Sequence, residues 1–417
     1  MNSVFPKPHN FFVGLVFEEA LMTTHLFRFD EITWPEVAAL PRETPLFLPL
    51  GGGFELDRLP DLLRSSVEIG LLPALPFGWP GSSLETPLLV FAALLRNLVG
   101  NLLEDGFTSV HVLTPPGLDL GPGLPGIVLP RPVPRAGTGT TTLASPRLSF
   151  GEPGLPRQAT GPLALPTDCE KVVILPVGHT EQHGYHAPLS TDTLIIEAIG
   201  RGTAQVVPER ALSLPVFPYG VSTHRRSFPG TFNVGGRAFE DFWLAVVDTL
   251  VGRGFTRFYL MSGHGGNSSF LVNVVKYAGE KYPQIFCATA FLYLSGPQGV
   301  AALQARRQSG LGGMGHACEL ETSLILHLRP ELIHLERAVD ETDFVTTPNY
   351  YMEWIEGGAL TANPPWEDDT RTGAYGAGSL GTAEKGKFWL EAAIAEKVEH
   401  VAEIHEQYRR RRERRKA

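Results

Sequence analysis

Residues 171–192 read KVVILPVGHTEQHGYHAPLSTD, and this stretch decides the fold that the sequence predicts. Its first part, 171–177, is rich in β-branched and apolar residues and ends at a glycine, which is typical of a buried strand. Helical spacing follows at 193–203 and 239–252, and a second strand-like run covers 256–261. This alternation predicts an α/β fold, a three-layer αβα sandwich in which helices cover a mostly parallel sheet.

The composition is that of an ordinary soluble protein. The 417 residues are 43% hydrophobic and 19% charged, and the formal net charge is −9. An acidic balance argues against broad nucleic-acid binding, and no window holds about 18 uninterrupted apolar residues, so we expect neither nucleic acid nor membrane as a partner. Three cysteines are too few for a disulfide framework, which fits a reducing compartment. We therefore expect a cytoplasmic protein.

A long stretch rich in Pro, Gly, Thr and Ser, residues 115–166, divides the chain. A connection of this length is unusual inside one compact domain and therefore predicts a linker between two units. The predicted division is an N-terminal unit at 1–116, a Pro/Gly-rich linker at 117–165, a C-terminal α/β domain at 166–405 and a basic tail at 406–417.

The two halves share a faint internal repeat. PLFLPLG at 45–51 matches VVILPVG at 172–178, PFG at 76–78 matches PYG at 218–220, and GFT occurs in the same order at 106–108 and 254–256. The repeated strand and helix patterns favour an internal duplication over two unrelated α/β segments with similar turns. The first copy has Phe54, Leu56 and Pro116 where the second has Glu181, His183 and His264. Glutamate and histidine are common metal ligands, whereas Phe, Leu and Pro side chains offer no ligand atom, so we expect the first copy to bind no metal.

The densest polar cluster follows the first strand. Within 178–192 it holds Glu181, His183, His186 and Asp192, all of which are possible metal ligands. Glu181 and His183 are two residues apart, so in an extended segment both point to the same side. Mixed carboxylate and imidazole ligands suit Zn, Mn or Fe(II) better than Ca or Mg. The alternative, a polar surface loop, explains one histidine more easily than it explains the whole cluster.

Two further clusters offer ligands. SGHGGNS at 262–268 follows a strand and places His264 among glycines that let a substrate approach closely. A phosphate cradle is the weaker reading of that turn, because its spacing fits neither common phosphate-binding fingerprint. GHACELETS at 315–323 contains His316 and Glu319, whose three-residue spacing would place both on one face of a helical turn.

Taken together, these clusters resemble the motifs of the creatininase (creatinine amidohydrolase) family over residues 165–405. The motifs that carry the resemblance are LPVGHTEQHGYHAPLSTD at 175–192, FPGT at 228–231, GHGGN at 263–267, HACELETS at 316–323 and GTAEKG at 381–386. The N-terminal repeat then looks like a degenerate partial copy of the same domain. Its TWPEVAA at 33–39 resembles the segment that commonly opens these proteins.

The resemblance implies a metal-dependent amidohydrolase with a binuclear centre that cleaves amide-like C–N bonds. Glu181, His183, Asp192, His264 and Glu319 match the metal ligands, with Asp192 in the bridging place, and His316 matches a catalytic histidine. Two divalent transition ions, Zn, Mn or Fe, would share a hydroxide and polarise the carbonyl, while the histidine protonates the leaving nitrogen. The residues expected to contact substrate are Ser222, Arg225, Gly265, Gly266 and Asn267.

Several positions depart from the family pattern and make a creatinine-specific pocket doubtful. His224 and Arg225 replace the usual Glu-His pair before FPGT, and Leu320 stands where Trp is common. If Arg225 clamps an anionic group, an anionic amide is favoured over neutral creatinine; the alternative is a solvated loop. Relatives open cyclic amides, deformylate small molecules or trim a peptide during cofactor maturation, and the sequence leaves these substrates open.

The sequence leaves open which partners the protein has and whether it is an enzyme or a scaffold. We expect a homo-oligomer, and the basic end of the last helix, 383–412, is either a solvated terminus that complements the helix dipole or a site for an anionic partner. The rival to an amidohydrolase is a catalytically silent scaffold, which the altered residues 224 and 225 would allow. The intact ligand positions in the second half favour the enzyme.

Overall fold

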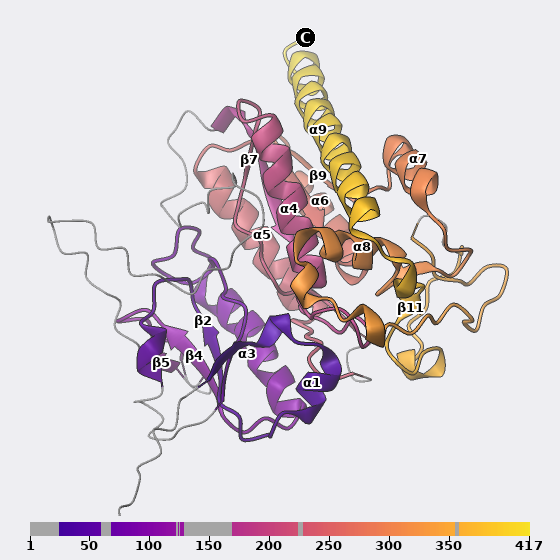
Figure 1. Cartoon of the computed structure of the whole chain (residues 1–417). Helices are drawn as coiled ribbons and strands as arrows, with labels where there is room; N and C mark the ends of the chain where they lie inside the picture. The colour runs from indigo at the N-terminus through magenta and orange to yellow at the C-terminus, as the bar shows by residue number, and fades with distance from the viewer. Residues whose placement is uncertain are drawn as a thin grey trace, which may run out of the picture.

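The computed structural model describes residues 25–59, 68–121, 124, 126–128, 169–223, 228–354 and 358–417. We call 25–128 the N-terminal unit and 169–417 the C-terminal unit. Each unit is built on a parallel sheet, drawn in Figure 1 in indigo and purple for the first and in magenta and orange for the second. The expected α/β fold is confirmed.

The C-terminal sheet has the strand order β7-β6-β8-β9, and every neighbouring pair is parallel. Its strands are β6 (Val172–Val177), β7 (Ala211–Ser213), β8 (Arg257–Ser262) and β9 (Phe286–Ala290). The side chains of β6 point alternately into two hydrophobic cores, because successive residues of a strand face opposite sides of the sheet. Val173 and Leu175 lie in one core, whereas Val172 and Ile174 lie in the other. Both faces are therefore covered.

Helices on the two faces complete the three-layer sandwich. One face packs against α4 (Thr191–Val206), α8 (Glu319–Leu328) and α9 (Ala383–Arg414). The other face packs against α5 (Gly236–Gly252) and α6 (Ser268–Lys281). The chain between α6 and α9 adds α7 (Pro297–Arg306) and a small antiparallel pair, β10 (Met314–His316) with β11 (Tyr375–Gly376).

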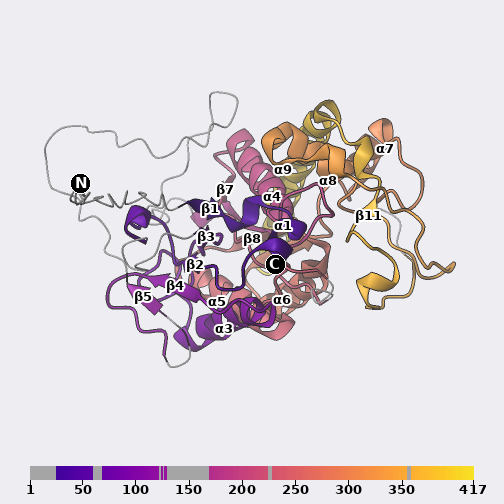
Figure 2. The same cartoon turned by 60° about the horizontal axis from the view of Figure 1, so that its bottom comes forward.

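The N-terminal sheet has the order β1-β3-β2-β4-β5, again with parallel neighbours. Its elements are β1 (Leu26–Arg28), α1 (Trp34–Ala39), β2 (Leu46–Pro49), β3 (Ile69–Leu71), α3 (Leu88–Glu104), β4 (Val110–Thr114) and β5 (Gly126–Val128). Helix α3 lies beside α5 in both orientations (Figures 1 and 2), and one continuous hydrophobic core runs through both units.

Strand order and register correspond between the two units. Leu46 of β2 pairs with Gly70 and Val110, and Val173 of β6 pairs with Leu212 and Phe258. Leu46 and Val173 are the positions that the PLFLPLG and VVILPVG match superposes. The order β3-β2-β4-β5 has the same sequence of connections as β7-β6-β8-β9. We retain internal duplication as a proposal, which this shared register supports.

Two predicted boundaries differ from the structure. The N-terminal unit does not end at 116, because Ile127 of β5 pairs with Leu113 of β4. The segment 406–417 is not a separate tail, because α9 continues to Arg414 with ion pairs such as Arg409 to Glu406 and Glu413, one turn away on the same helix. Most of the predicted linker, 129–165, lies outside the described residues.

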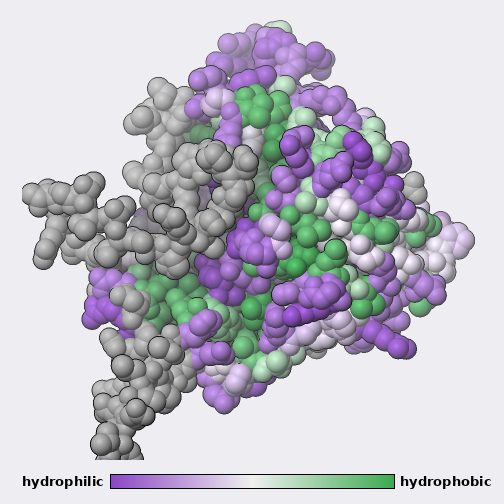
Figure 3. All heavy atoms as spheres, in the orientation of Figure 1, coloured by the Kyte–Doolittle hydropathy of each residue, from purple (hydrophilic) through white to green (hydrophobic). Residues whose placement is uncertain are grey.

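The end of α9 is a hydrophilic surface, at the top of the view in Figure 3. Among the described residues, no helix is long and apolar enough to cross a membrane.

Candidate metal centre

The candidate ligands meet at the carboxyl ends of β6 and β8. Glu181 and His183 lie in the loop after β6, and Asp192 lies in the first turn of α4, which that loop leads into. His264 follows β8 directly. Because these two strands are parallel neighbours, their ends share one edge of the sheet, where functional groups gather in such folds.

The Asp192 carboxylate stands between two groups of side chains. Its Oδ1 lies 3.2 Å from His183 Nε2, and its Oδ2 lies 3.3 Å from His264 Nδ1. Glu181 joins the second imidazole, with Oε1 2.9 Å from His264 Nδ1. Glu321 joins the first, with Oε1 3.9 Å from His183 Nε2. Asp192 therefore lies between two pairs of candidate ligands.

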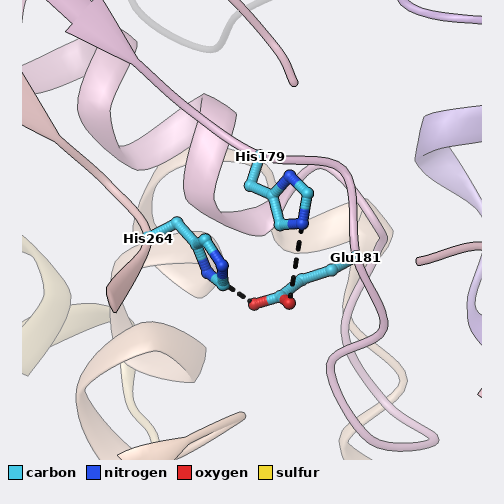
Figure 4. A group of neighbouring side chains, drawn as sticks. All are labelled: His179, Glu181 and His264. Carbon is cyan, nitrogen blue, oxygen red and sulfur yellow. Dashed lines mark ion pairs between the residues drawn. The ribbon is translucent and has the colours of Figure 1, made fainter. Parts of the chain in front are cut away.

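The ligand atoms form three overlapping groups, each within 4.8 Å. The groups are His179, Glu181 and His264, then Glu181, His183 and His316, and finally His183, Asp192 and Glu321. Figure 4 shows the first of them, with the Glu181 carboxylate between the two imidazoles. All three groups are made of residues from the C-terminal unit.

The donor set fits divalent transition cations. All three carboxylates, Glu181, Asp192 and Glu321, are buried, and buried charge is costly unless it is compensated. His183 Nε2 and Asp192 Oδ2 are buried polar atoms that make no hydrogen bond. A bound cation would satisfy both atoms, and mixed imidazole and carboxylate ligands suit Zn, Mn or Fe.

The electrostatics of the site also favour positive charge. Burial alone would lower the pKa of His264, but the Glu181 and Asp192 carboxylates raise it to about 10. Burial would likewise lower the pKa of His183, yet Asp192 and Glu321 raise it well above its ordinary value. Burial would raise the pKa of Glu321, but its contact with His183 lowers it. The carboxylates thus hold protons on the imidazoles where cations would otherwise bind.

Backbone hydrogen bonds fix which nitrogen of each histidine faces the centre. A carbonyl can only accept, so the ring N–H donates in each of the following contacts. His183 Nδ1 donates to the Glu181 carbonyl, His264 Nε2 to Val221 and His316 Nε2 to Gln182, at 3.1, 3.0 and 2.7 Å. When a ring is neutral, as metal binding requires, its opposite nitrogen presents a lone pair to the site.

His179 has the reverse arrangement. The backbone N–H of Gly220 donates to its Nδ1 at 2.9 Å, so the proton of the neutral ring is on Nε2. That Nε2 lies 3.8 Å from Glu181 Oε2. A protonated nitrogen cannot bind a metal, so His179 is positioned to orient the Glu181 carboxylate, the role that a neighbouring N–H plays toward many metal ligands.

We expect His179→Ala to weaken binding of a divalent ion beside Glu181 and His264 about 10- to 100-fold, while both ions can still bind at higher concentration. Titration with Co²⁺, followed by its visible absorption, measures the affinity and the ligand geometry together. The matched control is His327→Ala at the end of α8, outside the site. Complete loss of one ion would identify His179 as a ligand, and unchanged affinity and spectrum would remove its positioning role.

Glu319 is not at the centre, contrary to the sequence prediction. Its carboxylate pairs with Lys385 Nζ at 2.6 Å and accepts the backbone N–H groups of Gln308 and Ser309. The prediction placed His316 and Glu319 on one helical turn, but His316 ends β10 and α8 begins only at Glu319. The carboxylate that reaches the site is two residues further on, at Glu321.

The residues expected to contact substrate divide into two kinds. Gly265 and Gly266 line the cavity that also contains Glu181, Asp192 and His264. Asn267 is instead buried, where its side-chain oxygen accepts the Val221 N–H and its amide donates to the Gly178 carbonyl. It joins the loops after β6 and β8, and neither it nor the buried Ser222 is among the lining residues.

Two other sequence candidates lie away from the ligand groups or outside the described residues. His186 contacts Thr322 Oγ1 through Nε2 at 2.9 Å and is in none of the three groups. Burial lowers the pKa of His186 to about 4, which keeps the ring neutral. Arg225, with its neighbours at 224–227, lies outside the described residues.

Hydrogen bonds to the N-terminal unit hold the ligand loop, the segment between β6 and α4. The backbone N–H groups of Leu189 and Ser190 donate to the carbonyls of Ile32 and Asp30, at 3.1 and 2.9 Å. The Trp34 indole donates to the Thr372 carbonyl at 2.8 Å. The first two bonds hold the segment that leads into Asp192 from more than 150 residues upstream in the chain, and the third holds the chain shortly before β11.

Sequence reasoning missed two residues of the site. Glu321 belongs to the HACELETS motif, and counting its position from the true start of α8 would have placed it in the first turn. His179 lies inside the densest cluster, but only the Gly220 contact distinguishes it from a ligand. Glu321 could be placed only once the start of α8 is known, and His179 has no distinguishing signal in the sequence.

Comparisons with known proteins find a family model and several relatives that match this chain. The family model described as creatinine amidohydrolase matches residues 164–401. The creatinine amidohydrolase of Pseudomonas putida is 30% identical over 241 residues, which cover 54% of this chain and 86% of that protein. A mycofactocin precursor peptide peptidase of Mycobacterium tuberculosis is 28% identical over 245 residues, which cover 55% and 84%. A crystal structure of creatinine amidohydrolase is 28% identical, covers 56% of this chain and 90% of that one, and has a TM-score of 0.47.

Proposed function

This chain belongs to the creatininase family, and from that premise we propose that it is a metal-dependent amidohydrolase. The proposed reaction is hydrolysis of a C–N bond in a cyclic amide, a formamide or another small amide. The observation that carries the proposal is the Asp192 carboxylate, which stands between two buried imidazole and carboxylate pairs at the floor of a cavity.

The chain offers ligands for two divalent ions. Glu181, His264 and Asp192 would hold one, and His183, Asp192 and Glu321 would hold the other. Zn, Mn or Fe in these positions would supply a more acidic water and a polarised substrate carbonyl. The three carboxylates would leave a small net positive charge once two divalent ions are bound, which suits stabilisation of a developing oxyanion.

His316 is placed to move the proton. Its Nε2–H is held by the Gln182 carbonyl, so the Nδ1 lone pair faces the centre, 3.6 Å from Glu181 Oε1. Burial and the neighbouring His183 lower the pKa of His316, which keeps the ring neutral. Nδ1 would accept a proton from the attacking water and deliver it to the leaving nitrogen.

We expect His316→Asn to lower kcat about 10²- to 10⁴-fold, because proton transfer to the leaving nitrogen is lost. Metal content, measured by elemental analysis, should stay at the wild-type value. His334→Asn is a matched control, because that ring lies on the surface beside Glu336. A variant that keeps its kcat, or one that loses an ion, would show that His316 does not have the proposed role.

The experiment that tests the function begins with protein purified without chelator. Two transition ions per chain, together with hydrolysis of at least one member of a panel of lactams, formamides and short peptides, would support the amidohydrolase. No bound metal and no turnover would support the silent scaffold.

A peptidase that matures a peptide-derived cofactor is the second candidate. It is favoured by the similarity to the mycofactocin precursor peptide peptidase. Cleavage of the peptides in the panel without cleavage of the lactams and formamides would select it. The prediction that Arg225 favours an anionic amide can be tested on the same panel, as a selective rise in KM for anionic substrates in Arg225→Ala.

A further inference from the structure

Two cavities are neighbours, because Met352 and Trp366 line both of them. The inner cavity, of about 150 Å³, has Glu181, Asp192 and His316 among its lining residues. The outer cavity, of about 170 Å³, extends from Trp366 over residues of the segment that joins α8 to α9. The outer cavity therefore lies next to the cavity that contains the candidate ligands.

A row of rings connects the outer cavity to His316. The Trp366 ring meets the His316 ring edge to face, with centroids 4.9 Å apart. Tyr375 follows at 4.8 Å from Trp366, and Phe344 stacks on Tyr375 at 4.3 Å. Tyr375 is in β11, where it pairs with His316 of β10. The strand pairing thus fixes the aromatic wall relative to the histidine.

The chemistry of the outer cavity selects against an anion. Its lining is mainly apolar and aromatic, and Asp369 is the charged residue among the described lining side chains. The Asp369 carboxylate already accepts the Tyr375 hydroxyl and the Val345 N–H, both at 2.8 Å. A second carboxylate placed here would be repelled, whereas an uncharged group would bury apolar surface.

From these contacts we infer that the outer cavity binds an uncharged aryl or branched aliphatic group of the substrate, next to the amide that is cleaved. A cavity of about 150 Å³ lined by apolar side chains is large enough for one benzene ring. The outer cavity reaches that size, and its rings can meet an aryl group edge to face. This inference rests on the proposed function, because it assigns a substrate class to the same site.

The test compares acetamide with phenylacetamide and 4-carboxyphenylacetamide on the metal-loaded full-length protein. We expect kcat/KM for phenylacetamide to exceed that for acetamide by at least about tenfold, and the added carboxylate to abolish the gain. Tyr350→Ala removes an aromatic side chain from the lining of the outer cavity and leaves the candidate ligands and His316 in place, so it should remove the preference for phenylacetamide over acetamide. Tyr277→Ala, an exposed tyrosine on α6, is the matched control and should keep the preference.

Calorimetry with acetohydroxamate and phenylacetohydroxamate separates this inference from the proposed function. Tighter binding of the phenyl compound, lost in Tyr350→Ala, would support the aryl site even if no amide were hydrolysed and the proposed function failed. Equal binding of the two hydroxamates, or a preference that Tyr350→Ala does not alter, would overturn the aryl site even if amides were cleaved.

Discussion

Asp192→Asn is expected to empty both cation positions and to lower kcat/KM by at least about 10³-fold. The two carboxylate oxygens face His183 and His264 separately, so an amide in their place loses an anionic ligand on each side. Loss of two cations removes several kcal/mol of transition-state stabilisation, and each 1.36 kcal/mol is a factor of ten in rate. Elemental analysis and steady-state kinetics on one preparation measure both effects.

The matched control for this variant is Asp248→Asn on α5. The Asp248 carboxylate is partly exposed and pairs with Lys281 Nζ at 2.6 Å. It belongs to none of the three ligand groups. It should keep the wild-type metal content and rate. Retention of two ions by Asp192→Asn would show that Asp192 does not bridge the two groups.

Glu321→Gln and Glu319→Gln are expected to have different defects: the first should lose metal, and the second should lose stability. Glu321→Gln should lose the ion beside His183 and most of the activity, because its carboxylate is the third ligand of that position. Glu319→Gln should keep its ions but lower the free energy of unfolding by about 3 kcal/mol, because it leaves the buried Lys385 ammonium unpaired. Denaturant titration of the metal-free proteins and elemental analysis distinguish the two.

This pair of variants tests the correction to the sequence prediction. The opposite pattern, with metal loss in Glu319→Gln and none in Glu321→Gln, would return the ligand role to Glu319. Equal loss of metal in both would mean that the Lys385 pair supports the centre through the first turn of α8.

The ligands that follow strands could be predicted from the sequence. Glu181, His183, Asp192 and His264 follow β6 and β8 closely, and the topology of a parallel sheet brings such positions together. The ligand at the helix start could not be placed by spacing alone. Its identity depends on where α8 begins, and the left-handed φ of 50° at Ala317 separates His316 from that helix.

Contacts between distant segments account for the other differences. The boundary at 116 was misplaced because β5 is a short strand, recognisable only by its pairing with β4. The hydrogen bonds that join Asp30 and Ile32 to the ligand loop are between backbone atoms, so the pattern of side chains in the sequence could not predict them. The register of β2 against β4, in contrast, agrees with the match of PLFLPLG to VVILPVG, because Leu46 and Val173 occupy equivalent positions.

Anomalous diffraction from crystals of the zinc- or manganese-loaded protein tests the central claim most directly. We predict two peaks on either side of the Asp192 carboxylate, one beside Glu181 and His264 and the other beside His183 and Glu321. A single peak, or peaks that Asp192 does not join, would contradict a centre built on two cations.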